Sequence, residues 1–231
     1  YAKLIQESKL SCVKLQMLDL SFTQVTNISM LSALTQLSKL DLGGTDISNI
    51  STLSKLTQLS KLDLFHTDVT DISALSALTQ LHTLDLSCTD ISDWSVLSTL
   101  TQLQKLAVNN TIFSNTSLLS SLNQLRMLNL SYTDVSNVSM LSKLTQLSAL
   151  DLNHTQVWNT SPLSSLTKLY VLNLNKTHIS NVSMLSVLTQ LHTLNLNETR
   201  VSDVSKLYKL NQLHTLELSN TKISDISTLS S

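Results

Sequence analysis

Glycine and proline, the residues that most often shape turns, are nearly absent: the chain has 2 Gly and 1 Pro in 231 residues. Its many turns must therefore be built from Ser, Thr, Asn and Asp, whose side chains can bond nearby backbone groups. Charge is also scarce, with 13% charged residues and a net charge of −1. Nucleic acids and anionic membranes require clustered Lys and Arg, so neither partner is expected. No apolar run reaches the ~18 to 20 residues of a membrane span, so we expect no membrane insertion within this sequence.

Repetition is what the sequence has in abundance. A 22-residue unit recurs from Leu15 without insertion or deletion and reads L-x-x-L-x-L-x-x-T-x-[VI]-[ST]-[DN]-[IV]-S-x-L-S-x-L-T-Q. Its first Leu, here called position 1, falls at residues 15, 37, 59, 81, 103, 125, 147, 169, 191 and 213. Unbroken self-similarity at such a period is typical of a stacked solenoid.

The array sets the expected domain organisation. Residues 15–231 form ten repeats, of which the last is truncated. Residues 1–14 do not fit the register and are interpreted as an N-terminal cap or the remnant of a preceding segment. Leu4, Ile5, Cys12 and Val13 could cover the apolar edge of the first layer, which repeat arrays require. The last repeat stops at Ser231, which predicts that the array is part of a longer one.

Spacing within the unit predicts its local structure. Leu at positions 4 and 6 alternates with period 2, which indicates a short strand, and neighbouring copies should pair in parallel. In the second half of the unit, apolar residues are spaced by three, which suits a short 3₁₀-like turn. We expect Asn or Asp at position 13, with the Ser two places later, to cap that turn. The side opposite the strands should be slim.

The pattern from Leu15 to Ser231 resembles the leucine-rich repeat family. It is most similar to the 22-residue subclass found in bacterial internalins and in a regulatory subunit of protein phosphatase 1. The resemblance implies a right-handed solenoid with a parallel β-sheet on its concave face and 3₁₀-like turns on its convex face.

One position departs from the family pattern. Where the family usually has Asn, position 9 is Thr in all ten copies. A hydroxyl satisfies fewer backbone groups than an amide, although the β-branch packs well beside a strand. Because positions 6 and 11 are apolar, we predict an internal, structural Thr ladder. The alternative is an exposed Thr array of the ice-binding kind.

The two cysteines do not form a disulfide framework. Cys12 and Cys88 are separated by about four repeat steps, or roughly 19 Å at ~4.8 Å per step, well beyond the ~7 Å limit for a bridge. Two free thiols favour a reducing, cytoplasmic location. The cell surface or a secreted location is the alternative.

Specificity must come from positions that vary, and in this fold positions 2, 3, 5, 7, 8 and 10 flank the strand. Position 5 is Asp in each of the first four repeats, and position 10 changes from Asp in the N-terminal repeats to Arg200 and Lys222 near the C-terminus. We interpret this face as a polarised dock for a protein partner; drift from a consensus Asp is the alternative. The candidate partner-binding residues are Asp41, Asp63, Phe65, His66, Asp68, Asp85, Asp90, Tyr132, Asp134, His154, Tyr170 and Arg200. For the aromatic candidates, exposed rings often anchor partners, but each could instead lie flat over its neighbours.

Other chemistry finds little support. His192 and His214 occupy position 2 of adjacent repeats, near Glu217, but the tetrapeptide Leu-His-Thr-Leu occurs three times. Copying therefore explains the pair better than metal coordination. The sequence has no Ser-His-Asp constellation with supporting context, no Gly-rich phosphate loop and no His-Glu-x-x-His motif, so we expect neither an enzyme nor a cofactor.

The two tryptophans mark irregular repeats. Trp94 takes the position-14 core slot one repeat before Thr116, and Trp158 similarly precedes Thr160. A large residue beside a small one could conserve core volume across neighbouring layers. A local change in curvature where a partner docks is the alternative.

The function that follows is a non-enzymatic scaffold that binds a protein through its concave face. The family resemblance implies either a surface adhesin or an intracellular regulatory subunit of a phosphatase-like enzyme, and does not choose between them. A structural spacer without a specific ligand is the third alternative. Fold alone does not decide function in a family used this widely.

Overall fold

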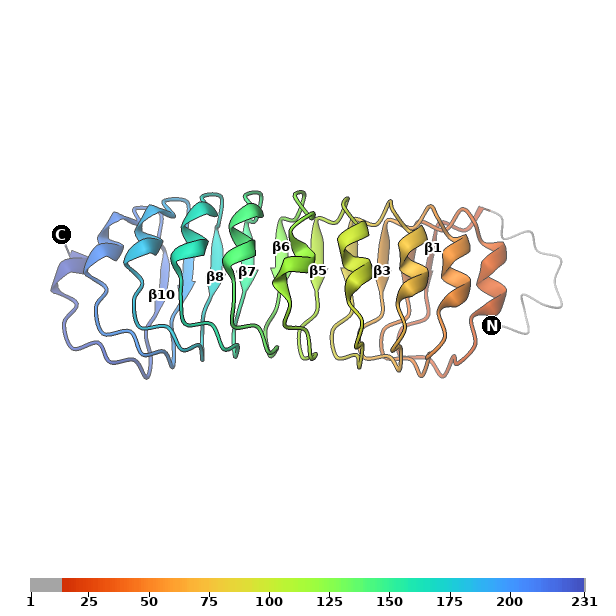
Figure 1. Ribbon diagram of the computed structural model, residues 1–231, viewed down its shortest axis with the longest axis horizontal. Helices are drawn as coiled ribbons and strands as arrows, with labels where there is room; N and C mark the ends of the chain where they lie inside the picture. The colour runs from red at the N-terminus through yellow and green to blue at the C-terminus, as the bar shows by residue number, and fades with distance from the viewer. Residues whose placement is uncertain (1–13, 231) are drawn as a thin grey trace.

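The computed structural model describes residues 14–230 as an elongated solenoid (Figure 1). Ten strands form one parallel sheet in sequence order, each paired to the next with a constant offset of one repeat. The strands are β1 Met17–Asp19, β2 Lys39–Asp41, β3 Lys61–Asp63, β4 Thr83–Asp85, β5 Lys105–Ala107, β6 Met127–Asn129, β7 Ala149–Asp151, β8 Val171–Asn173, β9 Thr193–Asn195 and β10 Thr215–Glu217. The predicted leucine-rich-repeat solenoid is confirmed.

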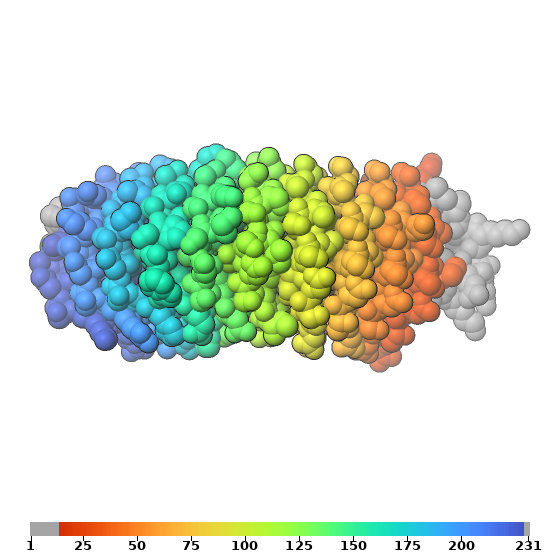
Figure 2. All heavy atoms as spheres, viewed as in Figure 1, coloured from red at the N-terminus to blue at the C-terminus, as the bar shows by residue number. Residues whose placement is uncertain are grey.

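Short 3₁₀ turns cover the other side of the solenoid, one per repeat (Figure 1). They are η2 Ser29–Ala33, η3 Ser51–Lys55, η4 Ser73–Ala77, η5 Ser95–Thr99, η6 Thr116–Leu119, η7 Ser139–Lys143, η8 Ser161–Ser165, η9 Ser183–Val187, η10 Ser205–Lys209 and η11 Ser227–Ser230. Figure 2 shows successive repeats as adjoining bands along the long axis. No helix among residues 14–230 is long and apolar enough to cross a membrane.

Each 3₁₀ turn begins at the same side-chain bond. The Oδ1 atom of Asn or Asp at position 13 accepts the backbone N–H of the Ser two residues later in all ten repeats, at 2.7–3.1 Å. This Asx geometry satisfies a donor that the turn itself leaves free. The predicted capping role of position 13 is confirmed.

Each strand occupies positions 3 to 5, one residue earlier than predicted. The central Leu at position 4 points into the core, while positions 3 and 5 lie on the outer face of the sheet. Every Leu at position 4 from β2 to β9 is at most 2% exposed. The sheet therefore presents two parallel rows of side chains, at positions 3 and 5, along its whole length.

The Thr at position 9 forms an internal ladder, as predicted. Its hydroxyl donates to the carbonyl oxygen three residues earlier in all ten repeats, at 2.5–2.9 Å. In seven repeats the residue is at most 6% exposed. The hydroxyls lie inside, so an ice-binding array is excluded. Each bond stays within its own repeat, so the ladder shapes the turn and does not link the layers.

Position 8, immediately before this Thr, has a left-handed backbone in every repeat. Its φ angle lies between 51° and 66°, and only one of the ten residues is glycine, Gly44. Left-handed φ costs a non-glycine residue roughly 1–2 kcal/mol. From Phe22 to Glu198, each N–H at this position bonds the carbonyl of position 7 in the next repeat, which helps to offset that cost. The expectation that Ser, Thr, Asn and Asp alone build the turns is therefore wrong here, because Phe, Tyr, His, Cys, Lys and Glu also occupy position 8.

The two tryptophans differ in environment. Trp94 is 6% exposed, and its ring meets that of Phe113 in the next repeat edge-on, with centroids 5.3 Å apart. Trp158 is 66% exposed, so the interpretation that it fills core volume beside Thr160 is wrong. Position 12 points outward, and Thr160 is buried with its hydroxyl donated to the Asn181 carbonyl.

Two expectations lie outside the described residues. The N-terminal cap falls on residues 1–13, so its packing and the domain boundary at Leu15 stay predictions. The same holds for the separation of Cys12 from Cys88. Cys88 is a free thiol at position 8 of its repeat.

Candidate protein-binding surface

The Asp residues at position 5 have a structural role that does not depend on a partner. The Oδ1 atom of Asp41 accepts the backbone N–H of Gly43, and the Oδ1 atom of Asp63 accepts that of Phe65. The same bond, two residues forward, occurs in eight repeats at 2.8–3.1 Å, and Asn makes it as well as Asp. Neither drift nor binding is needed to explain why position 5 is Asp or Asn, because the side chain ends the strand.

The negative charge of this row nevertheless has an electrostatic consequence. Strand register places Asp41, Asp63 and Asp85 directly side by side. Burial raises the pKa of Asp63 above its ordinary 3.8, and the neighbouring carboxylates of Asp85 and Asp41 raise it further. Burial likewise raises the pKa of Asp151. An Asn would make the same backbone bond without this penalty, so the charge itself is not required by the turn.

A second charged row was missed in the sequence. Lys39, Lys61 and Lys105 occupy position 3, two residues before the acidic row and on the same face of the sheet. The N-terminal part of the concave face therefore carries a basic row beside an acidic row. The period of 2 in a strand was the signal that could have revealed it.

The centre of this face is hollowed. A concavity of about 530 Å³ extends across β3 to β8. Its least polar part is contributed by Ala107, Met127, Ala149 and Val171, at positions 3 and 5 of neighbouring strands. Asp63, Asp85 and Asp151 line it at position 5, and Lys61 and Lys105 at position 3. None of the apolar residues was among the sequence candidates, because each looks like a loss of consensus when read alone.

The predicted aromatic residues form two separate groups of ring contacts, one at position 8, after the strand, and one at position 2, before it. Tyr132 stacks on His154 at position 8 of adjacent repeats, with ring centroids 4.7 Å apart. Tyr170 stacks on His192 at 3.9 Å, and His192 on His214 at 4.9 Å, all at position 2. These rings therefore lie over one another, which was the alternative to partner anchoring, although Tyr132 and Tyr170 remain 50% exposed.

The histidine pair is explained by stacking. The rings of His192 and His214 lie within 2° of parallel, and their Nδ1 atoms contact the carbonyls of Gln190 and Gln212. A carbonyl can only accept, so the Nδ1 atom of each ring carries a proton. Within residues 14–230, no group of three or more His, Cys, Asp or Glu could hold a metal ion.

The remaining candidates are dispersed. Phe65 and His66 are sequence neighbours whose rings are 5.8 Å apart and tilted. Asp68, Asp90 and Asp134 are exposed at position 10, beyond the turn and away from the two sheet rows. Arg200 is exposed at position 10, and its backbone N–H bonds the Ile179 carbonyl of the preceding repeat. The structure places the position-5 carboxylates next to one another and stacks the rings in pairs. The position-10 charges lie apart from both groups.

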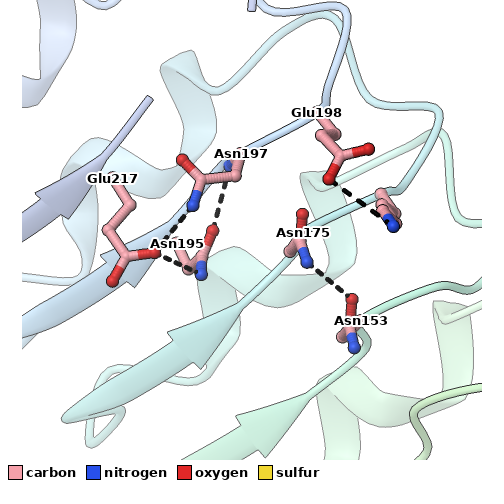
Figure 3. A network of polar contacts seen from close by, with 7 residues as sticks. Asn153, Asn175, Asn195, Asn197, Glu198 and Glu217 are labelled. Atoms are coloured by element: carbon pink, nitrogen blue, oxygen red, sulfur yellow. Dashed lines mark hydrogen bonds and ion pairs between the residues drawn. The ribbon is translucent and has the colours of Figure 1, made fainter. Parts of the chain in front are cut away.

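Toward the C-terminus, Asn side chains bond one another and the carboxylate of Glu217 (Figure 3). The Nδ2 groups of Asn195 and Asn197 both donate to Glu217 Oε2, at 2.6 and 2.7 Å. The Nδ2 of Asn175 donates to Asn153 Oδ1 at 2.9 Å, linking two repeats. Here side chains of adjacent repeats bond one another, whereas the acidic row repels itself.

Comparisons with known proteins agree with this architecture. A family model described as Leucine Rich repeats (2 copies) matches residues 13–56, 57–99 and 189–231. The chain belongs to the leucine-rich repeat family. No curated protein sequence matches it.

Solved structures extend the likeness over most of the chain. An internalin (inlF) from Listeria monocytogenes is 28% identical, with a TM-score of 0.85 over 96% of this chain and 74% of its own. Internalin C2 from the same organism is 29% identical, with a TM-score of 0.62 over 88% of this chain and 80% of its own. The ectodomain of the Arabidopsis thaliana receptor kinase GASSHO1/SCHENGEN3, in complex with CASPARIAN STRIP INTEGRITY FACTOR 2, is 22% identical. It has a TM-score of 0.72 over 91% of this chain and 30% of its own, which is a likeness of fold alone.

Proposed function

We propose that this chain is a non-enzymatic recognition scaffold that docks a protein partner in the hollow of its concave face, in the manner of a surface adhesin. The observation that carries the proposal is the hollow of about 530 Å³ spanning β3 to β8. Its apolar centre is bordered by carboxylates at position 5 and by Lys side chains at position 3. Similarity to two internalins over most of the chain supports the adhesin type.

The chemistry of the hollow specifies the complementary partner. An apolar side chain would fill the space above Ala107 and Met127, and Lys or Arg on either side would pair with Asp85 and Asp151. Burial already disfavours the ionised form of Asp151, so a partner cation would relieve an existing penalty. The Lys row at position 3 repels the same cations, which fixes how the partner lies across the sheet.

The spacing of the carboxylates sets the length of the contact. Asp85 and Asp151 are three strands apart in the sheet, or roughly 14 Å at ~4.8 Å per strand. An extended segment rises about 3.3 Å per residue, so it spans that distance in about four residues. We therefore expect a recognition segment in which two basic residues flank a short apolar stretch.

The test must remove charge without breaking the turns. Asp→Lys substitutions would also remove the acceptor for the position-7 N–H, so loss of binding would be ambiguous. Asn keeps that acceptor, as Asn129, Asn173 and Asn195 already do. A displayed library of random dodecapeptides is selected on the wild-type chain and on the triple variant D63N/D85N/D151N.

Wild type should enrich peptides with two basic residues around an apolar stretch, and the triple variant should bind them at least tenfold more weakly. A107R, which fills the hollow, should abolish binding, whereas the exposed D68N should not change it. Enrichment of unrelated sequences, or equal binding by the triple variant with an intact circular dichroism spectrum, would contradict the docking site. The adhesin role is tested separately with beads coated in the protein and applied to cultured cells. Specific adhesion that A107R removes supports it, and equal adhesion by A107R beads contradicts it.

A further inference from the structure

A single exposed tryptophan breaks an outward-facing row of small hydroxyl residues along the solenoid. Position 12 is Ser or Thr in nine repeats and Trp only at Trp158. The ten repeats act as internal copies, and nine of them show that the fold needs only a small hydroxyl residue there. Trp158 is 66% exposed, so it does not serve the core. The other tryptophan, Trp94, is buried.

Trp158 lines a hollow between repeats 6 and 7 that holds unused hydrogen-bond donors. The hollow has a volume of about 440 Å³. It is also lined by the polar residues Ser136, Asn137, Ser139 and Asn159 and by the apolar residues Val138 and Pro162. The Oδ1 atoms of Asn137 and Asn159 accept the N–H groups of the following Ser residues. Their Nδ2 groups, and the hydroxyls of Ser136 and Ser139, donate to no other residue within 14–230. Four donors therefore surround one indole ring.

Equivalent hollows elsewhere lack this combination. The one between repeats 3 and 4 is lined by Asp71 and Asp93, and another by Asp203 and Lys206. The hollow between repeats 1 and 2 is lined only by Ser, Thr and Asn side chains, such as Asn49. Among these four hollows in the described part of the chain, an uncharged lining is combined with an aromatic ring only at Trp158.

We propose that the Trp158 hollow binds an uncharged pyranose unit of an oligosaccharide. The face of an indole is electronegative and attracts the weakly positive C–H groups of a pyranose face. The sugar hydroxyls then accept from the four free donors. An apolar protein side chain would leave these donors buried without partners, which is costly. A charged ligand would find no ionisable side chain in the lining. The site lies outside the two sheet rows and is independent of the concave dock.

The test uses saturation-transfer NMR with cellobiose, maltose and N,N′-diacetylchitobiose, and with sialyllactose as a charged comparison. The intact chain should give transfer to at least one neutral sugar, saturating in the millimolar range typical of a single shallow subsite, up to about 20 mM. W158S restores the residue of the other repeats. It should abolish the signal while leaving thermal unfolding unchanged.

A gain of function provides the matched control. Ser48 stands at position 12 beside the uncharged hollow of repeats 1 and 2. In the W158S background, S48W should restore part of the transfer signal. Absence of transfer from every neutral sugar up to about 20 mM, or an unchanged signal in W158S, would overturn the proposal. If the intact chain gave no sugar signal and W158S lost binding to a partner protein, the hollow would be a protein contact. That result would also overturn the proposal.

Discussion

The first six repeats and the last four share one consensus but present different surfaces. In repeats 1 to 4 the position-5 row places Asp19, Asp41, Asp63 and Asp85 next to one another. In repeats 8 to 10 the same row holds Asn173, Asn195 and Glu217, whose neighbours include donors that bond to them. Like charges directly opposite in a sheet are destabilising, whereas amide and aromatic pairs stabilise.

The backbone differs between the two regions as well. In repeats 7 to 10 the position-10 N–H donates to the position-11 carbonyl of the preceding repeat, from Gln156 to Lys222. In repeats 2 to 6, where position 10 is Asp or Ile112, none of the described N–H groups makes this bond. The C-terminal repeats are thus joined by additional backbone bonds. The N-terminal repeats keep a charged surface that the turns do not require, which is what a binding surface would retain.

The largest expected loss of stability comes from weakening the core contact between repeats 4 and 5. Phe113 is fully buried in repeat 5 and packs edge-on against Trp94 of repeat 4. F113A should cost about 3–5 kcal/mol. Because repeats contact only their neighbours, this weak interface should let repeats 1 to 4 unfold at lower urea than repeats 6 to 10. Hydrogen exchange followed by mass spectrometry would resolve the two steps.

The adjacent residue supplies the control for that experiment. Ile112 is 60% exposed, so I112A should leave a single transition at the wild-type urea concentration. If F113A lowers the stability of all repeats together, the array unfolds as one unit. The difference between the regions would then have no energetic meaning.

Each Thr of the ladder should contribute equally to stability in the N-terminal and C-terminal repeats, so the ladder serves as an internal standard. Thr67 and Thr177 are both buried, and each hydroxyl donates to the carbonyl three residues earlier. T67V and T177V keep the shape but leave a buried carbonyl unpaired, at a cost of about 1–3 kcal/mol each. The two losses, measured by urea unfolding, should agree within about 0.5 kcal/mol. T67S, which keeps the hydroxyl, should be nearly neutral, and an equally large loss there would show that packing by the methyl group matters instead.

Sequence reasoning succeeded where one residue type recurs in every repeat. The Leu positions, the Thr ladder and the Asn or Asp cap at position 13 could be predicted because ten copies repeat the same local chemistry. It failed where the conformation is set by the backbone and not by the residue type. The left-handed conformation at position 8 is shared by residues as different as Gly44 and Tyr132, so no residue type signals it.

Sequence reasoning also missed the role of side chains that deviate from the consensus. Ala107 and Met127 form the hollow only together with their neighbours across the sheet, and that juxtaposition depends on strand register. The Asp row was identified as a surface feature, but its bond to the backbone two residues ahead could not be distinguished from a binding role. Whether the candidate residues contact a partner remains a prediction.

Removing one charge from the acidic row should stabilise the N-terminal region. Asp63 has a raised pKa, so the native state prefers its protonated form, and its ionised form at pH 7 lowers stability. D63N keeps the turn bond and should gain about 0.5 kcal/mol at pH 7. The wild type should recover that difference as the pH falls through the raised pKa of Asp63. Below the ordinary value of 3.8 the carboxyl is protonated in both states, so no further gain is expected.

Asp71 offers a matched comparison of opposite sign. The backbone and side-chain bonds from Ser73 lower its pKa, so its ionised form is the stabilising one. D71N should therefore lower stability at pH 7, and the wild-type contribution should disappear as the pH falls through the lowered pKa. Urea unfolding from pH 7 to below the ordinary value of 3.8 enters this window. A gain in both variants would mean that overall charge, and not local burial, controls the response.

The smallest effect is expected from the ion pair of the C-terminal region. Lys176 Nζ lies 3.5 Å from Glu198 Oε1, and the two side chains are 41% and 44% exposed. Solvent screening should limit the pair to below about 0.5 kcal/mol, so a double-mutant cycle with K176A and E198A should find little coupling. The advantage of the C-terminal repeats would then come from their additional backbone bonds, which salt does not screen. A coupling above about 1 kcal/mol that falls with added salt would instead assign that advantage to charge pairing, and the contrast between the two regions would become one of charge sign alone.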